Sequence, residues 1–219
     1  MGRLRIMSHN VWKNDKNLPA WAAKGEDCSA AVRAKGMVRI YAETQPDIIG
    51  FQEMSPTMVD EILLGLTSQD QRYALLWGRD TPILYRQDRF ELLDSDFFLY
   101  STELPGWAGE FNNSGTKSWC IAVFRDKTDG KKLAFMSTHL WWKSSDPASP
   151  DYQPGSDEAR VYQLNLAMDR LEQFHAQYDC PAVLVGDLNA AYTEPVIRSA
   201  LARGFAHTHD IATEYADPD

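Results

Sequence analysis

The chain contains an apolar run that leads directly into residues suited to catalysis. Val183–Val185 is followed by Gly186, Asp187 and Asn189. The run is short and β-branched, which is typical of a fully buried β-strand, and Gly186 permits a close approach of the backbone. Asp187 and Asn189 are two residues apart, so on an extended chain their carboxylate and amide share one face. Oxygen ligands placed in this way suit a metal ion or a phosphate group, and an Asx turn is the structural alternative.

Three other segments also end in polar residues. Asn10, Glu53 and His139 each follow an apolar run. All three are residue types that bind metal ions or transfer protons. A single polar residue at a strand end commonly has only a structural role. Four such ends that can share one edge of packed sheets indicate a functional site.

The elements that would position these residues alternate between strands and helices. Asp129 and Gly130 indicate a tight hairpin turn, and Ser156 is expected to cap a long helix. Helices on both sides of a hairpin-rich middle predict sheets packed on each other with helices outside. The predicted strands cover residues 4–11, 48–51, 74–77, 82–86, 97–100, 119–124, 133–140 and 183–185, and the helices cover 30–44, 56–66, 156–171 and 194–203.

Composition limits the classes of protein that fit. The chain has 219 residues, 44% of them apolar, which is enough for one domain with a large core. It contains no apolar run near 18 residues, so we expect no membrane span. The net charge of −9 argues against a protein that follows nucleic acid through its overall field, although a bound divalent cation can reverse the local sign.

The cysteines and the N-terminus bear on location. Cys28, Cys120 and Cys180 are odd in number and lack the spacing of a zinc site. The first residues lead directly into a strand pattern without the features of a signal peptide. We therefore expect a cytoplasmic protein that does not bind zinc.

Taken together, the four segments resemble the endonuclease/exonuclease/phosphatase family, the deoxyribonuclease-I-like metal-dependent phosphoesterases. The matching stretches are Arg5–Val11, Gln45–Glu53, Ser137–Leu140 and Val185–Ala190. They occur in the order found in the family, and the resemblance extends to about Thr208. It implies an α+β fold, a four-layer α/β sandwich of two packed mixed β-sheets flanked by helices, with the active site at one edge of the sheets.

The resemblance also implies roles for the polar residues at the strand ends. Glu53 would be the carboxylate ligand of a catalytic Mg²⁺ or Mn²⁺. Asn10 would offer its carbonyl oxygen to the metal or its amide to a phosphate. His139 would donate a hydrogen bond to a phosphate oxygen as charge builds. Asp187 and Asn189 would orient the attacking water and hold the phosphoryl group in line with it.

Three further residues are candidates for substrate binding. Trp141 and Trp142 directly follow His139 and are able to stack on a base, ring or sugar, or simply to wall the groove. Arg160 lies where the family often has an arginine, and a structural ion pair is its alternative role.

The C-terminal part departs from the family pattern. The family closes with another strand that bears Asp or Asn and with Ser-Asp-His, whose histidine activates water. His207 and His209 follow Gly204, where the family begins a non-catalytic segment. We expect a single domain over residues 1–219 that is incomplete at its C-terminus, and no hydrolase activity from this chain alone. Robust turnover by the isolated chain would contradict that expectation.

The leading interpretation is a metal-dependent phosphoesterase that hydrolyses a phosphate mono- or diester by metal-assisted in-line attack of water. The alternative is a non-catalytic binding module on the same scaffold. The acidic balance favours a phosphorylated small molecule or nucleotide over duplex nucleic acid, and a phosphosugar, phosphoinositide or lipid headgroup stays open. A serine or cysteine hydrolase fits less well, because there is no nucleophile-elbow motif.

Overall fold

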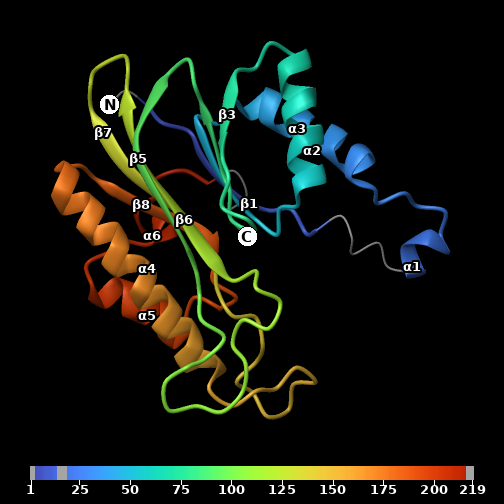
Figure 1. Ribbon diagram of the computed structural model, residues 1–219, viewed down its shortest axis with the longest axis vertical. Helices are drawn as coiled ribbons and strands as arrows, with labels where there is room; N and C mark the ends of the chain where they lie inside the picture. Colours follow the sequence, from blue (N-terminus) through green and yellow to red (C-terminus); the bar gives the residue numbers. More distant parts are fainter. Residues whose placement is uncertain (1–2, 14–18, 216–219) are drawn as a thin grey trace.

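A computed structural model describes residues 3–13 and 19–215 of the chain, and this part forms two mixed four-stranded sheets packed face to face (Figure 1). The outer strand pairs β1/β2 and β7/β8 are parallel, and the other neighbouring strands are antiparallel. The first sheet has the strand order β1 (Ile6–Asn10), β2 (Ile48–Gln52), β4 (Ile83–Arg86), β3 (Tyr73–Leu76). The second has the order β5 (Phe90–Leu99), β6 (Ser118–Asp126), β7 (Lys132–His139), β8 (Ala182–Asp187).

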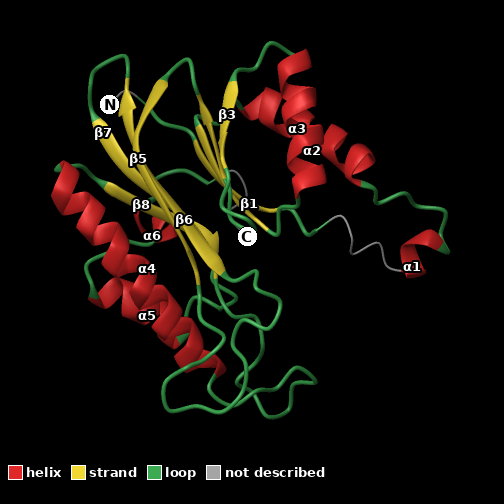
Figure 2. Cartoon of the chain, viewed as in Figure 1, coloured by secondary structure: helices red, strands yellow, loops and turns green. Residues whose placement is uncertain are grey.

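Helices cover the outer face of each sheet, so the four layers expected from the sequence are confirmed (Figures 1 and 2). The first sheet is covered by α2 (Ala30–Thr44) and α3 (Pro56–Ser68), and the second by α4 (Ser156–Tyr178) and α5 (Pro195–Ala202). Two short helices, α1 (Pro19–Ala22) and α6 (Thr208–Ile211), lie in connecting segments. Among the described residues, no helix has the length and apolar character needed to cross a membrane.

Two predicted helix features can be checked residue by residue. The helix predicted over 30–44 is α2, and Gln45 ends it in the left-handed conformation at φ 48°. The predicted cap at Ser156 is wrong. Gly155 occupies the N-cap position at φ 84°, and the Ser156 hydroxyl donates to Gln153 O at 2.8 Å. A Cβ on Gly155 would lie 2.6 Å from Trp107 Cδ2, so the close packing of that ring requires glycine.

The strand predicted over 97–100 is the end of a much longer one. β5 begins at Phe90 and contains a register shift between Leu92 and Asp94. Most of its residues are exposed or half-buried, because β5 is an edge strand. The bulge interrupts the alternation of apolar and polar residues, which explains why the sequence pattern did not reveal the first half.

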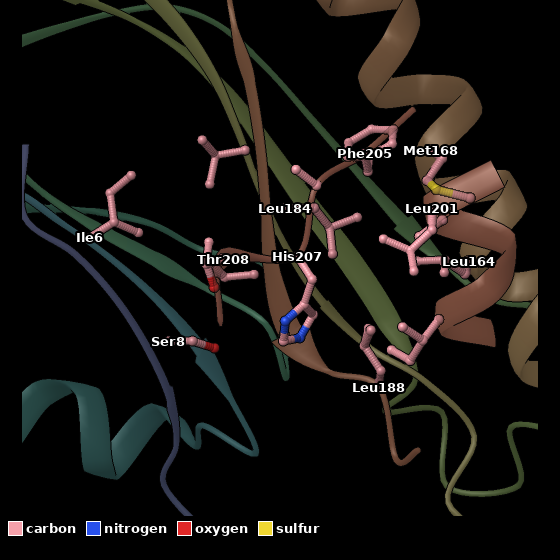
Figure 3. Close-up of a pocket in the computed structure, with 16 residues that line it drawn as sticks. Ile6, Ser8, Leu164, Met168, Leu184, Leu188, Leu201, Phe205, His207 and Thr208 are labelled. Carbon is pink, nitrogen blue, oxygen red and sulfur yellow. The ribbon is translucent and has the colours of Figure 1, made fainter. Parts of the chain in front are cut away.

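The strand that precedes Asp187 is less buried than predicted. Val183–Val185 was expected to be fully buried, but every residue of β8 is half-buried. β8 is the last strand of its sheet, and an apolar groove of about 580 Å³ lies beside it, lined also by β1, α4 and α5 (Figure 3). The close approach expected at Gly186 is confirmed, because a Cβ there would lie 2.3 Å from Thr138 O on β7.

The two sheets approach each other closely at Gly50 on β2. A Cβ at this position would lie 2.5 Å from Val185 Cγ2 and 3.0 Å from Ser137 Cβ. Polar contacts reinforce the approach: the Ser137 hydroxyl donates to Phe51 O at 2.8 Å, and Gln52 Nε2 donates to Ser137 Oγ at 3.1 Å. The ends of β2 and β7 are therefore held together at one edge of the sandwich.

We predict that Gly50→Ala lowers the free energy of unfolding by about 1–3 kcal/mol, because the added methyl group must push the sheets apart. Gly36→Ala is the matched control. Gly36 lies in α2 with nothing within 4 Å of the added Cβ, so the same change there should be neutral or stabilising by about 0.5–1 kcal/mol. Chemical denaturation of both variants measures the difference, and equal effects would contradict the close approach of the sheets.

Candidate active site

Four polar residues from distant parts of the chain meet at this edge. Asn10 Nδ2 donates to Asp187 Oδ2 at 2.8 Å and lies 3.4 Å from Glu53 Oε1. His139 Nε2 lies 3.7 Å from the same Asp187 oxygen. The structure thus brings together the ends of β1, β2, β7 and β8, as the sequence pattern predicts.

Asp187 and Asn189 form an Asx turn and also belong to the site. The Asn189 backbone N–H donates to Asp187 Oδ1 at 2.9 Å, and the Asn189 side-chain amide donates to Leu140 O at 3.0 Å. Asn189 has φ 49°, a left-handed conformation that asparagine tolerates better than most residues. The structural and functional interpretations of this segment are therefore compatible, since the turn fixes the carboxylate that faces Asn10.

A cleft of about 440 Å³ opens at this edge of the sheets. Four residues that the sequence singled out line it: Glu53, His139, Trp142 and Asn189. Figure 2 shows two long loops, residues 100–117 and 140–155, that extend beyond the strand ends and supply part of its wall. The remaining lining residues are Lys13, Asp80, Ser114, Thr116 and Lys117.

Asp80 is a central residue of the cleft that the sequence analysis missed. It is only 2% exposed, and its Oδ2 lies 2.7 Å from His139 Nδ1. The same oxygen accepts from the Glu53 backbone N–H at 3.3 Å, and Oδ1 pairs with Lys13 Nζ at 3.1 Å. Burial raises the pKa of Asp80, but the contacts with His139 and Lys13 outweigh it and leave this pKa below its ordinary value.

The position of Asp80 explains why a search of strand ends did not find it. It lies just before β4, at the start of a strand. Because β4 runs antiparallel to β2, the start of β4 lies at the edge where β2 ends. In the sequence, Asp80 is an acidic residue that precedes an apolar strand. This pattern points to the site only when the pairing of that strand is known.

Asp80 and Lys117 together define how His139 is protonated in this arrangement. An ionised carboxylate only accepts hydrogen bonds, so the bond to Asp80 requires a proton on His139 Nδ1. His139 Nε2 lies 2.6 Å from Lys117 Nζ, and an ammonium only donates. Nε2 therefore accepts from Lys117, and both nitrogens of the imidazole are engaged.

Glu53 adopts an unusual backbone conformation for a residue with a side chain. Its φ is 59°, and backbone strain of this kind is concentrated at functional sites. A Mg²⁺ or Mn²⁺ ion is commonly held by one or two carboxylates and several waters, and one glutamate beside an amide and Asp187 fits that donor set. Among the described residues, no group of three or more His, Cys, Asp or Glu is arranged to hold a metal ion, so a cation here would depend on fewer protein ligands and on water.

Asn10 is oriented between the two carboxylates. Its Oδ1 accepts from the Trp12 backbone N–H at 2.9 Å, while its Nδ2 faces Glu53 and Asp187. This arrangement relieves the repulsion between two neighbouring negative charges. The predicted role of Asn10 as a metal ligand stays a prediction.

The neighbouring residues Trp141 and Trp142 lie in different environments. Trp141 has no exposed surface and packs against Phe111, with ring centroids 5.9 Å apart. It is therefore unable to stack on a substrate, which corrects that part of the sequence analysis. Trp142 is 42% exposed and lines the cleft.

Arg160 lies outside the set of residues that line the cleft. It is 3% exposed, and its Nη1 donates to Lys143 O at 2.7 Å. Its Nη2 pairs with Asp157 and with Glu194. These contacts match the alternative of a structural ion pair that holds the 140–155 loop, and they do not place the guanidinium at the substrate.

Neither His207 nor His209 is among the residues that line this cleft. His207 lines the apolar groove beside β8 (Figure 3) and an adjoining hollow of about 400 Å³ that Asn10 and Asp187 also line. Its ring packs edge-on against Tyr192 at 5.1 Å between centroids. His209 is exposed on α6. The expectation that neither is catalytic stays a prediction.

We predict that Asp80→Asn lowers the free energy of unfolding at neutral pH by about 1–3 kcal/mol, since it removes the buried negative charge that His139 and Lys13 contact and replaces one acceptor oxygen with an amide donor. The pKa of Asp80 is lower in the folded state than in the unfolded state. Its contribution to the free energy of unfolding is therefore fully present above the unfolded-state pKa and is lost as the pH falls through the folded-state pKa. The difference in the free energy of unfolding between the wild-type protein and Asp80→Asn should therefore become smaller below about pH 4.

Asp88→Asn is the control for this prediction, because Asp88 forms an exposed ion pair with Arg86. Such a pair is worth about 0–1 kcal/mol, so its loss should be small. Denaturation curves recorded across the acid range compare the two variants. A deficit for Asp80→Asn no larger than that of Asp88→Asn would contradict the central role of Asp80.

Comparison with known proteins agrees with this geometry. The sequence model described as "Endonuclease/Exonuclease/phosphatase family" matches residues 7–218, whereas no curated protein matches. Among solved structures, a protein of that family from Bacteroides thetaiotaomicron is 18% identical, with a TM-score of 0.70, and the match covers 92% of this chain and 69% of the other.

A mannosyl-6-phosphatase from the same bacterium is 19% identical with a TM-score of 0.69, over 92% of this chain and 71% of the other. The human Nocturnin catalytic domain with bound sulfate is 16% identical with a TM-score of 0.69, over 98% of this chain and 76% of the other. At these identities the structural matches show the fold alone. The match over residues 7–218 shows the family as well: the chain belongs to the endonuclease/exonuclease/phosphatase family.

Proposed function

We propose that the protein is a metal-dependent phosphoesterase that hydrolyses a phosphate mono- or diester by in-line attack of water. The observation that carries the proposal is the convergence of Asn10, Glu53, His139 and Asp187 at one edge of the sheets. Glu53 and His139 line the cleft there, and Asn10 and Asp187 line a second hollow that shares Asn189 with it. Membership of the family supports it, as does the fold shared with a protein named as a phosphatase.

Glu53, with Asn10 beside it, would hold the Mg²⁺ or Mn²⁺ ion. When bound there, the ion would neutralise charge on the phosphoryl group. The hydrogen bond from the Glu53 backbone N–H to Asp80 holds the backbone at Glu53, which has φ 59°. Glu53 would then supply one carboxylate ligand at the cleft, which suits a hard cation that keeps part of its water shell.

Asp187 is the residue best placed to orient a water molecule. One of its oxygens is fixed by the Asn189 backbone and the other by Asn10, so the carboxylate is held in a defined direction. A fixed acceptor of this kind would accept a hydrogen bond from the water and direct the water oxygen towards phosphorus. The Asn189 side chain lines the same cleft and would hold the phosphoryl group in line.

The substrate class follows from the cleft and the overall charge. Trp142 offers a partly exposed ring at the cleft wall, which suits stacking on a base or a sugar. The net charge of −9 disfavours binding of duplex nucleic acid, which requires contacts to many backbone phosphates. A phosphorylated small molecule or nucleotide is therefore the substrate that we propose.

We predict that Glu53→Gln weakens Mn²⁺ binding at least about tenfold, because the neutral amide loses the charge attraction to the cation. Glu43→Gln is the control, since Glu43 is an exposed acid near the end of α2. Isothermal titration calorimetry with Mn²⁺ measures both variants. Unchanged Mn²⁺ affinity in Glu53→Gln would count against this site.

Turnover separates the enzyme from the alternative of a binding module. Release of phosphate from phenyl phosphate, or of phenol from diphenyl phosphate, in the presence of Mg²⁺ supports the enzyme and contradicts the expectation that this chain alone is inactive. Binding of Mn²⁺ and inorganic phosphate without any release favours the binding module.

A further inference from the structure

Lys117 is a buried lysine that nevertheless lines the cleft. Only 4% of its surface is exposed, and its Nζ lies 2.6 Å from His139 Nε2. Burying a flexible cationic side chain is costly unless specific partners compensate. A buried ammonium group that lines a polar cleft is therefore a candidate for a functional role.

The loop before β6 is held in place next to Lys117 by the side chain of Asn112. Asn112 is 1% exposed, and its side chain uses both ends to hold the loop. Its Nδ2 donates to Tyr100 O at 2.7 Å and to Lys117 O at 3.0 Å. Its Oδ1 accepts from the backbone N–H groups of Thr116 at 3.0 Å and of Lys117 at 2.9 Å. One asparagine thus fixes the backbone on both sides of Lys117.

The proton arrangement of His139 determines which side chain can face a ligand. His139 donates from Nδ1 to Asp80 and accepts at Nε2 from Lys117. In this arrangement His139 has no proton at Nε2 to give to a phosphate oxygen. Lys117 carries three N–H groups, so it can bond His139 and a ligand oxygen at the same time.

The positions of the other charged groups are consistent with Lys117 facing the ligand and His139 holding Lys117. Asp80 lies on the far nitrogen of the imidazole, with Lys13 on its second oxygen. Asp187 approaches His139 Nε2 only to 3.7 Å, and Glu53 Oε1 lies 3.4 Å from Asn10 Nδ2. Lys117 is therefore the cationic donor in direct contact with the histidine that was expected to bind the phosphate.

We propose that Lys117 is the residue that binds a phosphoryl oxygen in this cleft, and that His139 is a positioning residue that orients the Lys117 ammonium. The inference rests on the proposed function, because it concerns the phosphate group of the same substrate. It changes the role given to His139 by the sequence analysis, from direct donor to support for the donor.

The test is the affinity of the Mg²⁺-loaded protein for inorganic phosphate, measured by isothermal titration calorimetry. We expect Lys117→Met to weaken phosphate binding about 10- to 100-fold, the range for losing one charge-assisted hydrogen bond. Lys117→Arg keeps the charge and should recover part of the affinity. Lys131→Met is the matched control, because Lys131 is exposed on the β6–β7 turn and should have no effect.

Two further variants separate direct contact from support. His139→Asn should weaken phosphate binding less than Lys117→Met does, since the ammonium remains in the cleft. Asn112→Ala should weaken it without any change of charge, because the loop no longer holds Lys117 in place. Thermal unfolding of each variant confirms that it is folded under the conditions of the titration.

Several outcomes would overturn the inference. Wild-type phosphate affinity in Lys117→Met would show that Lys117 does not contact phosphate. A loss in His139→Asn larger than in Lys117→Met would show that His139 is the direct donor. If either result occurs while Mn²⁺ binding still depends on Glu53, the inference fails and the proposed function stands. If the wild-type protein binds neither Mn²⁺ nor phosphate, the proposed function fails with it.

Discussion

The close approach of the two sheets at Gly50 is the constraint on which the site depends. Each sheet has one parallel pair at its edge, β1 with β2 and β7 with β8, so two strands of each sheet end at the same side. Only a residue without a side chain lets β2 pack at this distance from Ser137 and Val185. The four strand ends then lie within 4 Å of one another in a chain of contacts, although Asn10 and Asp187 are 177 residues apart in sequence.

A second constraint is the buried carboxylate of Asp80. It lies at the start of β4 and contacts His139 from β7, the backbone of Glu53 after β2, and Lys13 after β1. Both sheets are therefore linked through one ionised group whose removal would leave polar partners buried. The same group orients the imidazole, and through the imidazole it orients Lys117. Stability and site geometry are coupled at this position.

The strand ends were predictable because apolar runs followed by polar residues locate them without knowledge of the fold. Asp80 and Lys117 were not assigned, since they precede strands and their places depend on antiparallel pairing. Trp141 and Trp142 show the same limit: adjacent side chains on an extended chain face opposite ways, and only the register decides which is buried. β8 was predicted as buried because its composition is apolar, whereas its edge position leaves it half-exposed.

A crystal structure of the protein grown with Mn²⁺ and inorganic phosphate tests the central claim most directly. The claim is that the edge where β1, β2, β7 and β8 end is one metal and phosphate site. The account predicts an anomalous Mn²⁺ peak at the Glu53 carboxylate, with phosphate bound in the same cleft beside Lys117. Mn²⁺ bound away from Glu53, or phosphate bound outside the cleft, would contradict it.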